Sequence, residues 1–198
     1  MSFGVSFGMG LKSMAETFGW TIEKAEDISE KYHRHMPFVQ PTLELVGEVA
    51  KRRGYVKTVY GNHARLSNPN KSYTMLCRYT QGSGAECLKL SIVIAYKEGI
   101  WEEINVVNTI HDELIGSIPV DEEHIKDVMR MAEIMRTSMP NLRVPLEAEM
   151  ELGDDWANTK TIDEWLEIRN TDEVKWNSLS DNLRKAILIA EKVRAQNG

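Results

Sequence analysis

The stretch NVVNTIHDELIGSIPVDEE, residues 105–123, decides the fold of this chain. Two short apolar runs flank the letters HDE, and β-branched residues are frequent in both, which is typical of two strands joined by a tight connection. We therefore predict a β-hairpin with Asp112 and Glu113 at or near its tip. The apolar positions of the two runs are Val106, Val107, Ile110, Leu114, Ile115 and Ile118.

The two adjacent carboxylates make this hairpin a candidate cation site. Asp112 and Glu113 repel each other at a hairpin tip, and this costs stability unless a cation binds there. The alternative is a solvated turn that is merely rich in acidic residues. The three letters HDE do not separate these interpretations, so the neighbouring sequence has to decide.

Composition limits the class of protein. The 198 residues are 42% hydrophobic and 27% charged, which suits one globular domain or a large piece of one. No apolar run approaches the ~20 residues that span a bilayer, and no secretory leader pattern opens the chain. We expect a soluble, intracellular protein with no membrane partner. Cys77 and Cys87 fit neither a zinc site nor a disulfide framework, so free thiols are expected.

One segment concentrates positive charge, although the formal net charge of −6 argues against a nucleic-acid partner for the chain as a whole. Residues 51–65, KRRGYVKTVYGNHAR, contain no acidic residue. We predict there a helix end stopped by Gly54, a strand over residues 55–60 and a turn at GNH. The segment is either a solvated basic face or a surface that contacts nucleic-acid phosphates. The candidate phosphate contacts are Lys51, Arg52, Arg53, Lys57 and Arg65.

Helical periodicity dominates the rest of the chain. The expected helices cover residues 10–17, 22–35, 38–53, 73–98, 121–139 and 179–193. The first is expected to continue an earlier helix, Thr21 is expected to cap the second, and residues 142–153 are expected to form a strand. The last helix has one apolar face, which either packs on its own chain or binds another protein. That face consists of Leu179, Leu183, Ile187, Ala190 and Val193.

The order of the segments resembles the C-terminal part of the family A DNA polymerases, the group of bacterial DNA polymerase I and its phage relatives. FGVSFGMG, GYVKTVYGNHAR, QGSGAECLKL, IHDELIGSIP and VPLEAEMELGDDW follow one another in the family's order over about residues 1–160. The resemblance implies an α+β fold. Fingers helices and the basic hairpin would occupy residues 1–72, and the C-terminal part of the palm, with an antiparallel hairpin carrying HDE, residues 73–160. Residues 161–198 would form a helical extension.

The same resemblance implies roles at the hairpin and on the long helix. Asp112 matches the palm aspartate that binds two Mg²⁺ ions during nucleotidyl transfer to the primer 3′-hydroxyl, and Glu113 matches the adjacent carboxylate at the metal site. His111 matches a residue near the primer terminus, and a capped turn histidine is the alternative. Gln81 matches a glutamine that reads the minor groove of the DNA near the new base pair.

Two aromatic residues complete the implied site. Phe3 and Phe7 match the fingers residues that stack on the incoming dNTP and on the templating base, whereas a core stripe is the alternative. The chain departs from the family at three places. Position 7 is usually Tyr, GNHAR replaces a more arginine-rich run, and Cys77 stands where many relatives have a polar residue.

The resemblance also implies a missing part. The family places an arginine and a lysine just before the position of Phe3, and the thumb and a first palm aspartate further upstream. We therefore expect the C-terminal subunit of a split DNA polymerase, inactive alone, that binds primer–template DNA and dNTP in the cytoplasm, or in the host cytoplasm if a phage encodes it. A second polypeptide would supply the missing groups and share the two Mg²⁺ ions. The alternative is a noncatalytic DNA-binding or partner-binding remnant of a disrupted gene. An unrelated metal hydrolase is disfavoured because the other histidines lack ligand spacing.

Overall fold

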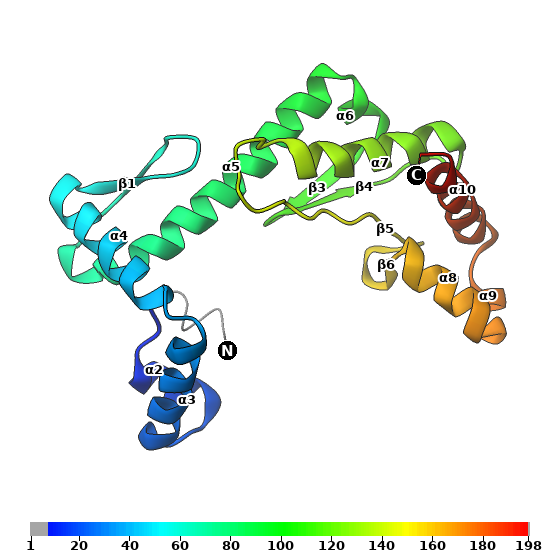
Figure 1. Ribbon diagram of the computed structural model, residues 1–198. Helices are drawn as coiled ribbons and strands as arrows, with labels where there is room; N and C mark the ends of the chain where they lie inside the picture. The colour runs from blue at the N-terminus through cyan, green and yellow to red at the C-terminus, as the bar shows by residue number, and fades with distance from the viewer. Residues whose placement is uncertain (1–7, 198) are drawn as a thin grey trace. The chain divides into compact units, whose positions relative to one another are not determined.

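The computed structural model describes residues 8–197 and shows helices with small antiparallel hairpins, an α+β fold as predicted (Figure 1). The chain forms two compact units, residues 1–86 (unit 1) and 87–198 (unit 2). Phe3 and Phe7 lie outside the described residues, so their stacking role stays a prediction. No helix within residues 8–197 is long and apolar enough to cross a membrane.

Three helices open the described part of unit 1. They are α2 (Leu11–Phe18), α3 (Ile22–His35) and α4 (Val39–Arg53). Thr21 caps α3 as predicted, because its hydroxyl accepts a hydrogen bond from the amide of Lys24 at 3.3 Å. The expectation that the first helix continues an earlier one is wrong for the described residues. Gly8 has a φ of +82° and Gly10 is extended, so a new helix begins at Leu11.

The basic segment forms the predicted hairpin. Gly54 ends α4 with a left-handed φ of 78°, a conformation that glycine adopts without steric cost. β1 (Tyr55–Lys57) then pairs antiparallel with β2 (His63–Arg65). β1 is shorter than the predicted strand over residues 55–60, because the backbone turns at Thr58. The Thr58 amide donates to the carbonyl of Asn62 at 2.9 Å, which closes the turn.

A short 3-10 helix, η1 (Pro69–Thr74), leads into the long helix α5 (Met75–Lys97), close to the predicted range of residues 73–98. Under the basic hairpin, unit 1 buries a small core. Its fully or nearly fully buried side chains are Ala50, Val56 and Met75. Burial of apolar surface from α4, β1 and α5 therefore fixes the hairpin on the helices.

Unit 2 contains the predicted HDE hairpin. α6 (Ile100–Glu103) precedes β3 (Val106–Ile110) and β4 (Glu113–Gly116), which pair antiparallel, and α7 (Glu122–Thr137) follows. Val106 and Leu114 pack against a core whose buried members are Ala95, Ile100, Ile104, Met131 and Ile134. The hairpin thus rests on a helical base.

The predicted strand over residues 142–153 is mostly wrong. Only β5 (Glu151–Leu152) forms, and it pairs with β6 (Lys160–Thr161) across the short 3-10 helix η2 (Trp156–Asn158). Pro145 cannot donate to a ladder, and the other residues of this segment meet no partner strand in the described structure. The segment therefore runs in irregular form along unit 2.

The tail forms three helices that pack on their own unit. They are α8 (Ile162–Thr171), α9 (Glu173–Ser178) and α10 (Asp181–Asn197). Ala186 and Ala190 of α10 share a buried cluster with Ile125 of α7. A neighbouring cluster contains Leu183, Ile187 and Trp165. The apolar face of the last helix is therefore covered by its own chain. The finer division at residues 72 and 160 stays a prediction.

Candidate functional site

A two-residue turn presents the HDE side chains. His111 and Asp112 connect β3 to β4, and Ile110 pairs directly with Glu113. Two-residue hairpin loops need a positive φ at their first residue, and His111 has a φ of 55°. This conformation is uncommon for a residue with a side chain, although His adopts it more readily than most, and the tight turn accounts for it here. The turn places Asp112 and Glu113 at consecutive positions at the tip.

Both carboxylates of the hairpin tip are exposed. Among the residues that the structure describes, neither Asp112 nor Glu113 makes an ion pair or a side-chain hydrogen bond. Their oxygens are the donors that Mg²⁺ prefers, so the pair fits part of an ion site. No group of three or more His, Cys, Asp or Glu within residues 8–197 is arranged to hold a metal ion. The metal role of Asp112 and Glu113 therefore stays a prediction.

The base of the hairpin is fixed by local hydrogen bonds. Asn105, with a φ of 39°, donates from its side-chain nitrogen to the carbonyl of Ser117 at 3.3 Å. The Ser117 amide donates back to the carbonyl of Asn105 at 3.3 Å. Within the described residues, Asn105 and His111 are the non-glycine residues with positive φ, one at each end of β3. The strand that carries the turn is thus constrained at both ends.

Gly116 lies at the base of the HDE hairpin, opposite Val106, and the sequence alone did not single it out. A Cβ built on it would overlap the carbonyl oxygen of Ile104, and the pairing register shifts between Val106 and Asn108. A glycine inside a strand pattern marks such a close approach of two backbones, and this was the available signal. Gly116 therefore lets the hairpin close over the end of α6.

An ionic cap steadies the helices beneath the hairpin. The Asp121 carboxylate accepts hydrogen bonds from the His124 amide at 3.0 Å and from its Nδ1 at 2.8 Å. The Nε2 of His124 lies 3.7 Å from the carboxylate of Glu103 in α6. The hydrogen bond that the His124 ring donates to Asp121 raises the pKa of His124, and the bonds from the His124 amide and ring lower the pKa of Asp121. This cap links the start of α7 to α6.

The basic hairpin presents one polar face. The register pairs Tyr55 with Arg65 and Lys57 with His63, so these four side chains share a face. The Tyr55 and His63 rings stack with centroids 3.9 Å apart and an interplanar angle of 18°. The sequence analysis missed this stack, which joins residues on two strands. Val56, on the opposite face, points into the core. The exposed face therefore combines cations with a stacked aromatic pair.

The predicted phosphate contacts all lie in unit 1. Within the described residues none of them makes an ion pair: Lys51, Arg52, Arg53, Lys57 and Arg65. The first three lie in the last turn of α4, where the helix dipole also favours cations, so the solvated-face alternative remains open for them. Gln81 is exposed on α5, and the next residue, Gly82, lies against Thr58 of the hairpin turn. The structure thus brings Gln81 and the basic hairpin together.

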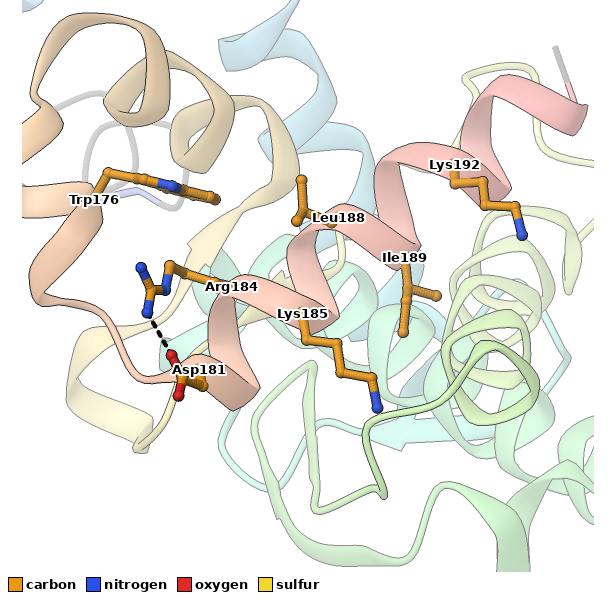
Figure 2. Close-up of a pocket in the computed structure, with 7 residues that line it drawn as sticks. All are labelled: Trp176, Asp181, Arg184, Lys185, Leu188, Ile189 and Lys192. Carbon is orange, nitrogen blue, oxygen red and sulfur yellow. Dashed lines mark hydrogen bonds and ion pairs between the residues drawn. The ribbon is translucent and has the colours of Figure 1, made fainter.

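A separate groove of about 600 Å³ lies on the tail, around α10 (Figure 2). Arg184 is paired with Asp181 at one end of it, and Leu188 and Lys185 point to different sides of the helix. The groove contains none of the predicted site residues. Its lining consists of Trp176, Asp181, Arg184, Lys185, Leu188, Ile189 and Lys192.

Comparisons with known proteins identify the family. The chain belongs to DNA polymerase family A, whose model matches residues 1–158. It is 28% identical over 169 residues to the thermostable DNA polymerase I of Thermus aquaticus, covering 81% of this chain and 20% of that protein. It is 31% identical over 160 residues to DNA polymerase DpoZ of Salmonella phage PMBT28, covering 77% of this chain and 25% of the relative.

A solved structure supports the same fold. The POL domain of Pol1 from M. smegmatis, in complex with DNA primer-template and dNTP, matches with a TM-score of 0.65 and 25% identity. The match covers 74% of this chain and 28% of that chain. The predicted resemblance is therefore confirmed, and the chain spans about a fifth of the length of its Thermus relatives.

Proposed function

We propose that this chain forms the C-terminal fingers and palm part of a DNA-templated DNA polymerase. The observation that carries the proposal is the exposed pair Asp112 and Glu113, without internal partners, at the constrained turn of a family A chain. Primer–template DNA and dNTP are the substrates, supported by the similar M. smegmatis domain, which was solved with both. The reaction joins the nucleotide to the primer 3′-hydroxyl.

Asp112 and Glu113 would hold Mg²⁺ through their carboxylate oxygens. When bound there, Mg²⁺ would supply Lewis-acid chemistry for nucleotidyl transfer, and the two carboxylates would hold it. Such a site takes anionic ligands from more than one segment, whereas these two carboxylates belong to a single turn. We propose that a second polypeptide completes the site with the first palm aspartate, the thumb and the arginine and lysine that grip the triphosphate.

The remaining residues bind and orient the nucleic acid. His111, held by its left-handed backbone, lies beside the carboxylates and faces the primer end in this proposal. The free cations of unit 1 contact phosphates, and Gln81 reads the minor groove, where both purines and pyrimidines present acceptors. Phe3 and Phe7 stack on the incoming and templating bases.

Primer extension tests the proposal. The chain is assayed alone and after mixing with a polypeptide that carries the rest of a family A polymerase domain, in Mg²⁺. We expect extension only from the mixture. Asp112→Asn keeps the size of the side chain but removes a charged ligand, so extension should fall by about 100-fold or more while DNA affinity is kept.

The matched control is Glu102→Gln, an exposed carboxylate of α6 in the same unit, which should extend normally. Normal primer extension by Asp112→Asn would show that HDE is a solvated turn without a metal role. Extension by the pure chain alone would contradict the shared site. DNA binding without extension in any mixture would favour the noncatalytic remnant.

A further inference from the structure

A carboxylate on α5 holds the turn of the basic hairpin. The Oε1 of Glu86 accepts hydrogen bonds from the hydroxyl of Thr58 and from the side-chain nitrogen of Asn62, both at 2.5 Å. Its Oε2 accepts from the backbone amide of Tyr60 at 3.1 Å. Three donors from five consecutive residues thus converge on one carboxylate that is 24 to 28 positions away in sequence. Hydrogen bonds to an ionised acceptor are about twice as strong as neutral ones.

A serine one turn earlier on α5 adds a fourth bond. The buried Ser83 donates to the carbonyl of Tyr79 at 2.7 Å, which orients its oxygen to accept from the Val59 amide at 3.1 Å. Between Gln81 and Ser83 lies Gly82, whose Cβ, if present, would lie 3.0 Å from the Cγ2 of Thr58. The turn therefore packs directly on α5, and a residue larger than glycine at position 82 would push the turn away from the helix.

This seating matters because the hairpin has only two short strands. A two-stranded ribbon is marginally stable by itself, so its orientation depends on what it is attached to. The ribbon carries Lys57 and Arg65 on its exposed face, and the helix carries Gln81 next to the seat. Fixing the turn fixes the distance between the cations and Gln81.

We propose that Glu86 is a positioning residue for DNA binding: it holds the turn over residues 58–62 on α5, so that Lys57 and Arg65 meet the phosphates while Gln81 faces the groove. This inference rests on the proposed function, since it takes the hairpin as a DNA contact. Glu86 itself does not touch DNA. Glu86 contributes to DNA binding by fixing the geometry of the hairpin. This contribution outweighs the repulsion between its negative charge and the DNA phosphates.

The sign of the effect separates this role from simple electrostatics. Removing a carboxylate makes the unit more positive, which by charge alone tightens DNA binding. Glu86→Ala removes the carboxylate and releases the turn, so we expect weaker binding of primer–template DNA. Glu86→Gln changes the charge equally and loses the bond from the Tyr60 amide, because an amide nitrogen cannot accept, but its one oxygen still accepts from Thr58 and Asn62. The turn therefore stays held by these two bonds, and the variant should bind DNA at least as tightly as the wild type. Glu30→Ala, an exposed carboxylate of α3, is the charge control.

The magnitude follows from counterion release. Each phosphate contact contributes about 0.9 to the steepness of the plot of log affinity against log salt concentration. One contact therefore changes the affinity about eightfold for each tenfold change in salt concentration. Loss of the contacts of Lys57 and Arg65 should therefore lower the slope by about one to two units for Glu86→Ala and leave it unchanged for Glu86→Gln.

Hydrogen exchange of the full chain without DNA tests the seating independently. We expect faster exchange of the Val59 and Tyr60 amides in Glu86→Ala, and Asn62→Ala provides a milder release if Glu86→Ala does not fold. Equal tightening of DNA binding by all three carboxylate variants, or unchanged exchange in Glu86→Ala, would overturn the inference. If the wild-type chain shows no salt-dependent DNA binding, the proposed function is overturned. If the Val59 and Tyr60 amides still exchange faster in Glu86→Ala than in the wild type, the attachment of the turn to α5 by Glu86 is nevertheless supported.

Discussion

Replacing Ile187 by alanine should strongly destabilise unit 2. The side chain is 0% exposed and lies in a cluster with Trp165 and Leu183, which are 3% and 5% exposed. The substitution removes three methyl or methylene groups, worth about 2.4 kcal/mol at ~0.8 kcal/mol each. The cavity left behind adds to this, so we expect a loss of about 3–4 kcal/mol in the free energy of unfolding, within the range for such truncations.

Urea unfolding of the whole chain measures the loss. Tryptophan fluorescence reports on the cluster because Trp165 is part of it, and far-UV circular dichroism reports on the helices. With a denaturant slope of about 1–3 kcal/mol per M, a loss of about 3–4 kcal/mol should lower the midpoint by roughly 1–4 M. The matched control is Leu188→Ala, the next residue of α10, which is 46% exposed and should cost less than about 1 kcal/mol.

Equal midpoints for the two variants would refute the reasoning, because a docked α10 must distinguish its buried face from its exposed one. The tail would then be free to bind another protein, as the sequence alone allowed. A docked tail predicts instead that truncation after Lys160 exposes Ile125, which is 0% exposed, and destabilises the unit that carries HDE.

The remaining predictions concern the hairpin and its cap. Gly116→Ala should lower the free energy of unfolding by about 1–3 kcal/mol, because its Cβ would displace the carbonyl of Ile104. Gly84→Ala, with open space around it in α5, should raise the free energy of unfolding by about 0.5–1 kcal/mol. Thermal unfolding compares the two variants, and equal shifts of the melting temperature would contradict the close approach at Gly116. Because the pKa of His124 is raised in the folded state, its pairing with Asp121 contributes fully to the free energy of unfolding below pH 6.5. This contribution is lost as the pH rises through the folded-state pKa of His124. The pKa of Asp121 is lowered, so the contribution of its charged form is lost only in acid. His124→Gln should therefore flatten the stability profile above pH 6.5, and an unchanged profile would show that other groups, such as nearby Glu103 and Asp127, dominate it.

Much of this fold can be predicted from short stretches of the sequence, because helix caps, helix ends and strand runs each depend on a few neighbouring residues. Thr21 and Asp121 cap helices through bonds to amides three residues away, and Gly54 ends a helix through its own φ, so these boundaries depend on a few neighbouring residues. Short apolar runs rich in β-branched residues on both sides of HDE predicted the hairpin. The order of these segments along the chain is enough to show the resemblance to family A and to match Asp112 and Glu113 to its palm motif.

Contacts between distant residues decided the rest. The expected strand over residues 142–153 shrank to Glu151–Leu152 because a strand forms only where another backbone offers hydrogen bonds, and β6 reaches only those two residues. Gly116 is needed because of a carbonyl twelve positions away, and Glu86 holds a turn that precedes it by 24 to 28 positions. A sequence records propensities over a few residues, whereas these partners are selected by the free energy of the whole packed unit.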